Sequence, residues 1–347
     1  MIGLIAVTAG GRRLALRLSQ TLADSELLMA ADGEKLRVAA LLQENWRRCD
    51  GFICVMAIGI VARAVAPILA AGGDKRHDPC IIVMDELGQY AVSFLSGHLG
   101  GGNELARRLA TICGGRAVIT TASDVLRLPA LDLWAREQNL ALESRYRMTK
   151  AQAMLVNHGF VTLYSEIPIQ FLPNGFIVTD DISQANIIVS NRRIVSDALL
   201  LRPRNLVLGL GCNRGATVAE LTEAVTALFD ELGFSLLAVR NLASIDQKKD
   251  EQGLLEFAGF NHWPLHFFSA AALNALAATL AAKNRQLAVS PAAMQAVGAI
   301  GVAEPAAMLS AATDSLLCGK RKWKNLTLAV AQASCTLSAS DPARRNI

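Results

Sequence analysis

The stretch SFLSGHLGGGNELARRLA, residues 93–110, concentrates groups that can do chemistry where a strand should hand over to a helix. His98 is the first candidate, because an imidazole can take up and release a proton near neutral pH. Ser96 is the second, because a hydroxyl can donate a hydrogen bond or act as a nucleophile. No companion spacing of serine, histidine and aspartate supports a catalytic triad. The stretch therefore predicts proton-transfer chemistry centred on His98.

The glycines of this stretch predict a backbone that turns tightly and lies close to a ligand. Gly97 and residues 100–102 carry no side chain at the positions where the chain must turn. The helix that follows would point free N–H groups and the positive end of its dipole into the same space. Such a site binds a carboxylate or phosphate, or stabilises a developing oxyanion. The expected ligand contacts are Gly97, Gly100, Gly101 and Asn103.

A purely structural interpretation stays open for the same residues. Asn103 would then cap the helix, and Glu104 would favour its first turn. A lone histidine after a strand is more often structural than functional. The convergence of His98 with several glycines still favours a functional site.

Alternation of short apolar runs with amphipathic ones predicts the elements that position this stretch. In the first third of the chain, strands and helices alternate, and residues 80–85 and 90–95 form a hairpin around the turn at 86–89. The expected fold class is α/β, with two open, mostly parallel sheet domains flanking a smaller α/β middle domain. The expected domains are 1–126, 127–203 and 204–337, followed by a tail at 338–347.

Ligands of open α/β sheets collect beyond the carboxyl ends of the parallel strands. We expect residues 57–59, 96–103 and 120–124 to lie together on that edge of the first domain. The hairpin would place residues 73–79, GDKRHDP, beside SGHLGGGN. Lys75, Arg76, His77 and Asp78 would then join the cluster. Asp85 and Glu86 would lie at the far tip as turn residues, about 20 Å away at roughly 3.3 Å per residue.

The second α/β unit opens on GLGCNRG, residues 209–215. Its glycines follow the spacing G-x-G-x-x-x-G, which is not the dinucleotide fingerprint, and no acidic residue ends the next strand. A nicotinamide cofactor is therefore weakly supported. An anion-accepting turn with Gly211 and Arg214 is plausible, and a nucleotide- or sugar-phosphate-binding enzyme is a reading that rests on these glycine turns alone.

The composition argues against several other classes of protein. The net charge of +4 comes without the Arg/Lys stripe and interleaved aromatics of a nucleic-acid-binding protein. The basic cluster GKRKWKN, residues 319–325, is typical of a solvated turn before the last strand, and a weak attraction for an anionic partner is the alternative. Arg63 and Pro67 interrupt the apolar window at 52–73, so we expect no membrane span and no signal peptide.

The cysteines and histidines predict neither disulfides nor a metal centre. The seven cysteines are odd in number, lie mostly in apolar runs and form no C-x-x-C, which indicates reduced thiols in the cytoplasm. Pro79 separates His77 from Cys80, and Pro264 lies between His262 and His266. We therefore expect no metal site built by the protein.

Two sets of strings resemble a known family. IGIVARAVAP, DPCIIVMDELGQYAVSFLSGHLGGGNELARRLA and VITTASD resemble the amino-terminal domain of the cobalamin-biosynthesis G proteins, the cobalt-precorrin-5A hydrolases. GLGCNRGATVAEL, LASIDQKKDEQGLLEFA, GVAEPAAML and LTLAVAQA resemble the carboxyl-terminal domain of that family. The resemblance covers about 1–125 and 205–335, in the family's order. Gly102, where many relatives carry alanine, and Asn213, at an often basic position, depart from the pattern.

The resemblance implies opening of a lactone on a cobalt-bound, ring-contracted tetrapyrrole in anaerobic cobalamin biosynthesis. The former bridging carbon leaves with its methyl group as acetaldehyde, and cobalt-precorrin-5B is formed. In such a reaction His98 or Glu104 would be the base, and Ser96 is the further catalytic candidate. Cationic side chains and helix N-termini would hold the acetate and propionate groups. The candidate substrate contacts are Gly59, Arg63, Lys75, Asp78, Gly97, Gly100, Gly101, Asn103, Gly211, Arg214, Ser244, Asp246 and Lys248.

The cobalt would arrive bound in the substrate, so the expected cofactor set is empty. The expected partner is the cobalt-containing tetrapyrrole, with transient contacts to neighbouring methyltransferases of the pathway. A non-catalytic corrinoid carrier of the same pathway is the alternative function. In the second domain, residues 244–250 would form either another wall of the tetrapyrrole cleft or only the capped start of a helix at Asp250.

Overall fold

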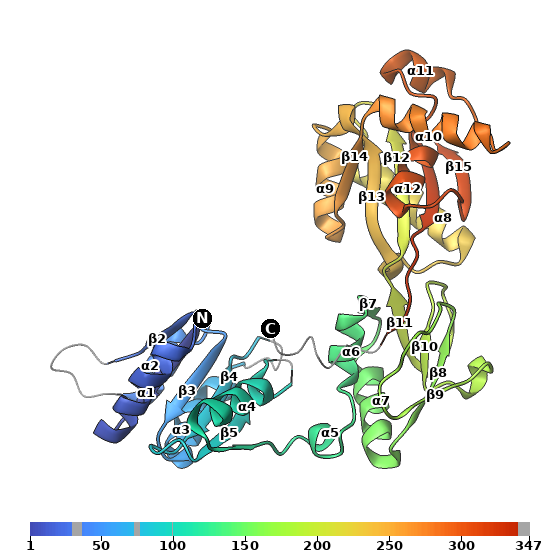
Figure 1. Cartoon of the computed structure of the whole chain (residues 1–347). Helices are drawn as coiled ribbons and strands as arrows, with labels where there is room; N and C mark the ends of the chain where they lie inside the picture. The colour runs from blue at the N-terminus through green and yellow to red at the C-terminus, as the bar shows by residue number, and fades with distance from the viewer. Residues whose placement is uncertain (30–36, 73–76, 99, 339–347) are drawn as a thin grey trace. The chain divides into compact units, whose positions relative to one another are not determined.

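The structure, a computed structural model, describes residues 1–29, 37–72, 77–98 and 100–338 of the 347-residue chain. The chain divides into two compact units with the boundary between Leu133 and Trp134. The first unit contains one sheet and the second contains two (Figure 1). Most strand pairs are parallel, and helices alternate with strands along the chain, which confirms the expected α/β class. The division into three domains stays a prediction.

The sheet of the first unit, here the N-terminal sheet, has six strands in the order β2-β1-β3-β4-β5-β6. The strands are β1 (Ile2–Ala6), β2 (Ser25–Leu27), β3 (Gly51–Val55), β4 (Cys80–Met84), β5 (Tyr90–Leu95) and β6 (Arg116–Val118). β1 to β4 are parallel, whereas β5 pairs antiparallel with β4 and parallel with β6. The expected hairpin is therefore confirmed, and β5 and β6 run against the other four strands.

Helices cover both faces of the N-terminal sheet. Side chains alternate between the two faces along each strand, so neighbouring residues of one strand pack against different helices. The helices are α1 (Ala9–Thr21), α2 (Val38–Asn45), α3 (Ile58–Ala70), α4 (Gly102–Cys113) and the single turn α5 (Ala122–Val125). Ile53 packs with α1 and α4 on one face. Its neighbours Phe52 and Cys54 pack with α2 and α3 on the other. Two buried layers thus hold the strand ends, and the loops that follow them, in place.

The reversal at β5 divides the loops of the first unit between two edges of the sheet. The register pairs Ile81, near the start of β4, with Leu95, the end of β5. The loop after β5 and the loop after β6 therefore lie on the edge where β3 and β4 begin. The loop at 57–59 follows β3 and lies on the opposite edge. The expectation that residues 57–59 join residues 96–103 and 120–124 is wrong for this reason.

The second unit begins with a smaller sheet of strand order β7-β11-β10-β8-β9. Its strands are β7 (Leu140–Leu142), β8 (Val161–Ser165), β9 (Phe176–Val178), β10 (Ile187–Val189) and β11 (Leu199–Pro203). The helical segments in this part are α6 (Leu131–Glu137), α7 (Arg145–His158) and the 3₁₀ turn η1 (Ile182–Gln184). Among the described residues of this sheet, the pair of β7 with β11 is antiparallel and the other strand pairs are parallel.

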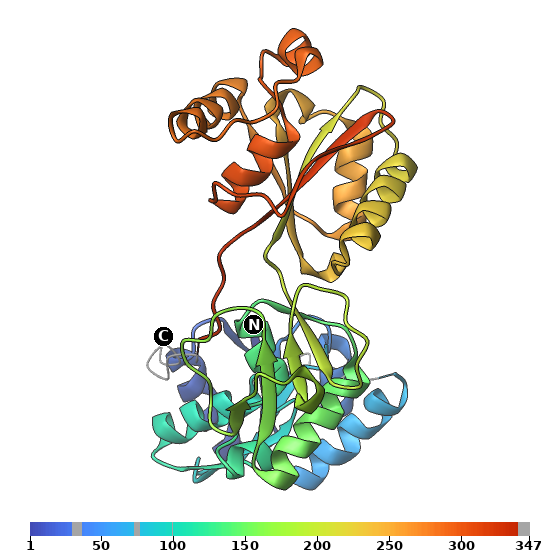
Figure 2. The ribbon, with the colours of Figure 1, turned by 90° about the vertical axis from the view of Figure 1, so that its right-hand side faces the viewer.

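The third sheet, here the C-terminal sheet, has the order β14-β13-β12-β16-β15. Its strands are β12 (Leu206–Cys212), β13 (Val239–Ile245), β14 (Leu265–Phe268), β15 (Cys318–Trp323) and β16 (Leu326–Gln332). Its helical segments are α8 (Val218–Leu232), η2 (Leu236–Ala238), η3 (Asp246–Lys248), α9 (Gln252–Asn261), α10 (Ala270–Ala282), α11 (Pro291–Val297) and α12 (Ala303–Ala311). α8 and α9 pack on one face and α10 and α12 on the other, as Figure 2 shows in yellow and orange.

The basic cluster at 319–325 lies mostly in the edge strand β15, so the expectation of a solvated turn is wrong for most of it. β15 pairs antiparallel with β16, and the turn of this hairpin is at Lys324 and Asn325. Lysine and arginine on an edge strand discourage pairing with another chain. Arg321 also forms an ion pair with Glu231. Within the described ranges no helix is long and apolar enough to cross a membrane.

Candidate functional site

The loop after β5 forms a closed hydrogen-bonded turn that leads into α4. Ser96 has a left-handed backbone with φ of 52°, and Gly101, with φ of 76°, precedes the first helical residue. The N–H groups of Gly101, Gly102 and Asn103 donate to the carbonyls of His98, Ser96 and Gly97 at 3.0, 3.2 and 2.8 Å. These three donors are used within the loop. The expectation of free helix N–H groups facing a ligand is therefore wrong for them.

Two of the glycines are required by contacts inside this loop. A Cβ on Gly97 would lie 2.5 Å from the Asn103 Oδ1, and a Cβ on Gly100 would lie 2.6 Å from the Ser96 Cβ. Real Cβ atoms do not approach other atoms so closely. The bare backbone at Gly97 and Gly100 thus serves the packing of the turn itself, which is the structural role that the sequence left open.

His98 stands between two side chains from the segment after β6. Its Nε2 lies 2.7 Å from the Ser123 Oγ, and its Nδ1 lies 3.4 Å from the Asp124 Oδ2. The imidazole keeps 26% of its side-chain surface exposed, so it is accessible to a ligand. Ser123 and Asp124 both belong to α5. The parallel pairing of β5 with β6 explains the meeting, because the ends of neighbouring parallel strands share an edge.

Asp124 is the centre of a network that reaches into α4. Its Oδ2 accepts from the Asn103 Nδ2 at 2.8 Å, and its Oδ1 accepts from the Arg107 Nη2 at 2.5 Å. Asn103 also donates to the Thr121 Oγ1 at 3.1 Å. The side chain of Asn103 therefore ties α4 to the segment after β6 and does not cap the helix, whose capping position is taken by Gly101.

The chemistry of this cluster depends on four residues to which the sequence assigned no role. Thr121, Ser123 and Asp124 belong to the segment 120–124 that was expected near residues 96–103, whereas Arg107 was not singled out. The feature of the sequence that could have identified the partners of His98 was the hairpin. Once β5 is known to reverse direction, a parallel β6 must end beside it, and TTASD follows β6 directly. The two side chains that contact His98 are consecutive in the sequence, and α4 and β6 lie between them and the histidine.

Glu104 and Ser96 take more peripheral positions than their sequence roles suggest. The Glu104 side chain is 59% exposed and pairs with Arg107 at 3.4 Å, one turn along α4. Ser96 contributes its backbone carbonyl to the turn, and the hydroxyl that contacts His98 belongs to Ser123. Neither Glu104 nor the Ser96 hydroxyl is therefore the group that meets the imidazole.

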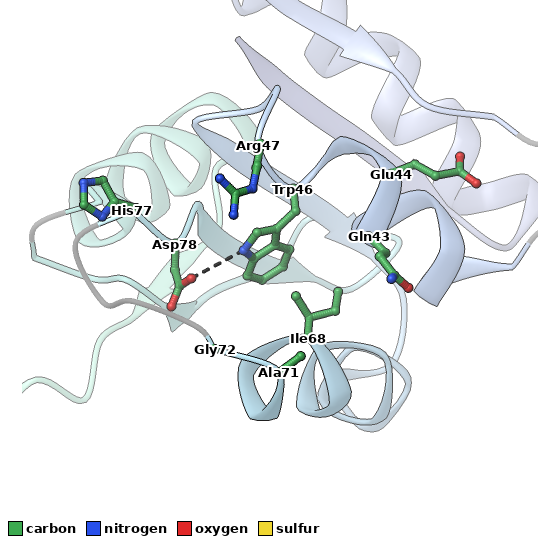
Figure 3. A pocket seen from close by; sticks show the side chains of 9 residues that line it. All are labelled: Gln43, Glu44, Trp46, Arg47, Ile68, Ala71, Gly72, His77 and Asp78. Atoms are coloured by element: carbon green, nitrogen blue, oxygen red, sulfur yellow. Dashed lines mark hydrogen bonds between the residues drawn. The ribbon is translucent and has the colours of Figure 1, made fainter.

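Asp78 lies on the same edge of the sheet, two residues before β4. It borders a cavity of about 450 Å³ and accepts a hydrogen bond from the Trp46 Nε1 at 3.4 Å. Figure 3 shows the indole of Trp46 lining this cavity, with its N–H directed to Asp78. His77, the residue before Asp78, also lines the cavity. Lys75 and Arg76 lie outside the described residues.

Gly59 and Arg63 lie on the opposite edge and do not meet His98. The Arg63 Nη1 donates to the Gly59 carbonyl at 3.0 Å within α3. A cavity of about 530 Å³ opens at this edge, with Thr8, Ala57 and Glu86 among its lining residues. Asp85, which also lines this cavity, is a turn residue as expected. Burial raises its pKa, but three backbone N–H donors outweigh that effect, and its pKa is lowered.

In the C-terminal sheet, the glycine turn is occupied by contacts of the protein itself. A Cβ on Gly211 would lie 2.5 Å from the Thr327 Oγ1, so the neighbouring strand requires glycine there. Arg214 makes two hydrogen bonds of 3.0 Å to the Asp250 carboxylate, and both side chains are well exposed. An exposed pair of this kind can exchange partners with a ligand carboxylate.

The end of β13 provides one buried hydroxyl, and the loop after it contains one buried ion pair. Ser244 is fully buried and donates to the Leu210 carbonyl at 2.7 Å, so its hydroxyl is not available to a ligand. The Lys248 Nζ donates to the Glu251 Oε2 at 2.9 Å, and the Glu251 Oε1 accepts from the Gly215 N–H at 2.7 Å. Glu251, which the sequence did not single out, thus joins this loop to the glycine turn. Asp246, at the start of η3, is half-buried.

No group of three or more histidine, cysteine, aspartate or glutamate side chains in the part of the chain that the structure describes could hold a metal ion. The seven cysteines are all free thiols. At His98 the geometry offers an imidazole held between a hydroxyl and a carboxylate.

Comparisons with known proteins match all three regions of the chain. The models described as cobalamin synthesis G N-terminal, cobalamin biosynthesis central region and cobalamin synthesis G C-terminus match residues 40–124, 129–203 and 206–331. Together they cover well over half of the chain. The chain belongs to the cobalamin synthesis G family. The resemblance found in the sequence is thereby confirmed.

Relatives in the cobalamin synthesis G family are similar along most of their length. The chain is 34% identical over 315 residues to the cobalt-precorrin-5A hydrolase of Priestia megaterium, covering 85% of this chain and 81% of that one. It is 32% identical over 297 residues to the protein of the same name from Salmonella typhimurium, covering 78% and 83%. A solved structure of a cobalamin biosynthesis protein G homologue from Sulfolobus solfataricus covers 96% of this chain and 97% of its own at 18% identity, with a TM-score of 0.38.

Proposed function

We propose that this chain hydrolyses cobalt-precorrin-5A. The observation that carries the proposal is the 34% identity over 85% of the chain to a relative named cobalt-precorrin-5A hydrolase. The reaction would open the lactone of the substrate and release acetaldehyde, leaving cobalt-precorrin-5B. The cobalt belongs to the substrate, and the protein would need no cofactor of its own.

His98 is the residue that would move protons in this reaction. It is exposed enough to face a ligand, and its ring is oriented by contacts at both nitrogens. Glu104 is a weaker candidate, because its carboxylate is mostly in solvent and lies against Arg107. We therefore assign the base to His98 rather than to Glu104.

The edge of the sheet around His98 offers room for a large substrate. The cavity beside Trp46 and Asp78 lies where β3 and β4 begin, on the edge where β5 and β6 end. Strands are spaced about 4.8 Å apart, and the end of β6 is level with Val83, three residues after the start of β4, so these two points are separated by roughly 14 Å. A macrocycle lying along this edge would reach both His98 and the cavity.

Further parts of the proposal concern location and partners. Seven free thiols support a reducing compartment, and we place the protein in the cytoplasm. The product and substrate are successive intermediates of one pathway, so transient contacts with neighbouring methyltransferases are part of the proposal. In the second unit, Arg214 would contact a substrate carboxylate by exchanging it for Asp250.

The test is an anaerobic assay of acetaldehyde release from purified protein and cobalt-precorrin-5A. We expect the unaltered chain to release acetaldehyde, and His98→Ala to lower the rate by about 10²–10⁴-fold, the usual contribution of a general acid–base group. His158→Ala, which removes an exposed imidazole at the end of α7, is the matched control and should leave the rate unchanged. Binding of the corrinoid without acetaldehyde release would instead favour the carrier function.

A further inference from the structure

The contacts of His98 determine which of its nitrogens carries a proton. Asp124 holds hydrogen bonds from Arg107 and Asn103, one at each oxygen, so its carboxylate is set up as an acceptor. An ionised carboxylate can only accept. The Nδ1 lies 3.4 Å from the Asp124 Oδ2, so in the neutral form of the ring it is the nitrogen placed to carry the proton. The Nε2 then carries the lone pair.

This tautomer assigns the direction of the second hydrogen bond. The Ser123 Oγ lies 2.7 Å from Nε2, and a lone pair there can only accept, so the serine hydroxyl is the donor. The proton that His98 can take directly is thus the hydroxyl proton of Ser123. A water molecule could reach Nε2 only by displacing that hydroxyl.

Ser123, His98 and Asp124 therefore stand in the relation of nucleophile, base and orienting group. That relation is recognised from geometry and roles, independently of the order in the chain. Asp124 orients the ring and would stabilise the imidazolium that forms when Nε2 takes a proton. Arg107 and Asn103 in turn hold Asp124, which is only 17% exposed.

We infer that Ser123 is the nucleophile that opens the lactone, and that Asp124 positions His98 for this step. The inference rests on the proposed function for the identity of the substrate. A lactone is an ester, and an ester carbonyl is the kind of electrophile that a serine activated by histidine attacks. Ser123 as a whole residue is 4% exposed, so the ester must approach from the side on which His98 is exposed.

The reaction would proceed in two balanced steps. First, the Ser123 Oγ bonds to the lactone carbonyl carbon while its proton moves to the His98 Nε2. The bond from that carbon to the ring oxygen breaks, and the oxygen leaves with the proton from Nε2, which forms an ester on Ser123. Second, water attacks this ester and gives a proton to Nε2. The macrocycle leaves as a free carboxylic acid, and the Ser123 Oγ recovers its proton. One water molecule is consumed.

A fluorophosphonate tests the nucleophile without the natural substrate. Attack by an activated serine on its phosphorus expels fluoride and leaves a phosphonyl group, which adds a fixed mass to the intact protein. We expect one label on the tryptic peptide 117–127, AVITTASDVLR, which contains Ser123. Ser123→Ala should abolish the label, and His98→Ala and Asp124→Asn should slow labelling by about 10²-fold or more. The matched control Ser19→Ala, a serine of α1 bonded only to a backbone carbonyl, should label normally.

The same variants are then assayed with cobalt-precorrin-5A. We expect Ser123→Ala to release acetaldehyde at least about 10²-fold more slowly than the unaltered chain, and acid quenching to trap a macrocycle ester on peptide 117–127 of the unaltered chain. An unlabelled wild-type protein, a label that survives Ser123→Ala, or full turnover by Ser123→Ala would each overturn the assignment. The labelling uses the folded wild-type chain, so a misfolded variant cannot decide it. Loss of the hydrolase function itself would appear separately, as a labelled wild-type protein that releases no acetaldehyde.

Discussion

Gly97 and Asn103 are in such close contact that the loop after β5 has no room for a side chain at position 97. A Cβ there would lie 2.5 Å from the Asn103 Oδ1 and 3.1 Å from its Cγ. Asn103 cannot easily give way, because it is 4% exposed and its Nδ2 is bonded to both Thr121 and Asp124. The glycine thus controls the position of the amide that holds the carboxylate next to His98.

Gly97→Ala should therefore lower both stability and activity. Forcing a methyl group into a packed site costs about 1–3 kcal/mol. Displacement of Asn103 would release Asp124 and reduce acetaldehyde release. Urea unfolding and the acetaldehyde assay measure the two effects. Gly259→Ala in α9 is the control, since nothing lies within 4 Å of its Cβ position and alanine is the better helix former. Normal turnover by a stable Gly97→Ala protein would contradict the role given to Asn103.

Glu104→Gln and Asp124→Asn distinguish the contributions of the two carboxylates that contact Arg107. Glu104 is 59% exposed and its pairing with Arg107 is a surface ion pair, which contributes about 1 kcal/mol at most. We expect turnover within about threefold of the unaltered chain for Glu104→Gln. Asp124→Asn should lose about 10²-fold or more, because the amide can donate to Nδ1 and favour the wrong tautomer. Equal losses of turnover in the two variants would support Glu104 as a candidate base.

Glu251→Gln should destabilise the second unit by about 3–5 kcal/mol at neutral pH. Both members of the Lys248–Glu251 pair are nearly buried, and the variant leaves a buried ammonium without its counter-charge. Urea unfolding at pH 7 measures the loss. Glu256→Gln, an exposed residue of α9 bonded to Gln252, should change the free energy of unfolding by less than about 0.5 kcal/mol.

The same pair predicts a dependence of stability on pH. Burial alone raises the pKa of Glu251, but the hydrogen bonds from Lys248 and Gly215 outweigh it, and the pKa is lowered from 4.5. A folded pKa below the unfolded value contributes stability above pH 4.5, and that contribution is lost as the pH falls through the folded pKa. The unaltered chain should therefore lose more free energy of unfolding between about pH 6 and pH 3 than Glu251→Gln does. Parallel curves for the two proteins would contradict this reading.

Ser244→Ala tests whether Ser244, near the end of β13, binds substrate. The hydroxyl is fully buried and bonded to the Leu210 carbonyl, so we expect a loss of about 1 kcal/mol in stability and no change in corrinoid affinity. Arg214→Gln should do the reverse, weakening corrinoid binding while leaving stability nearly unchanged, because its pair with Asp250 is exposed. Titration with a cobalt corrinoid and urea unfolding distinguish the two residues.

Local signals in the sequence were sufficient for most elements of the fold. The apolar run of β5 and its hairpin to β4 were predicted where the structure has them. The capping box of Thr217 and Glu220 that starts α8 is a pattern of the same local kind, and both of its hydrogen bonds are present. Capping and hydrophobic alternation depend on residues within one or two turns, so they can be read without knowing the fold. The basic cluster at 319–325 was misread, because charge alone does not distinguish an edge strand from a turn.

Only part of the candidate site could be predicted from the sequence. His98 and the turn around it stand out by composition, and the hairpin correctly brought residues 77 and 78 to the same edge. The same hairpin should have removed Gly59 and Arg63 from that edge, since a reversed strand ends where its neighbours begin. Ser244 and Gly211 were misleading because polar or glycine residues near strand ends can equally serve internal packing.

By itself the sequence determined that a histidine and several glycines lie between a strand and a helix of an α/β domain, and that this belongs to a recognisable family. Only the tertiary structure decided that Ser123 and Asp124 are the partners of His98. The physical reason is that a hydrogen bond across 25 residues depends on the direction and register of β5 and β6, and these are set by packing of the whole sheet rather than by neighbouring residues.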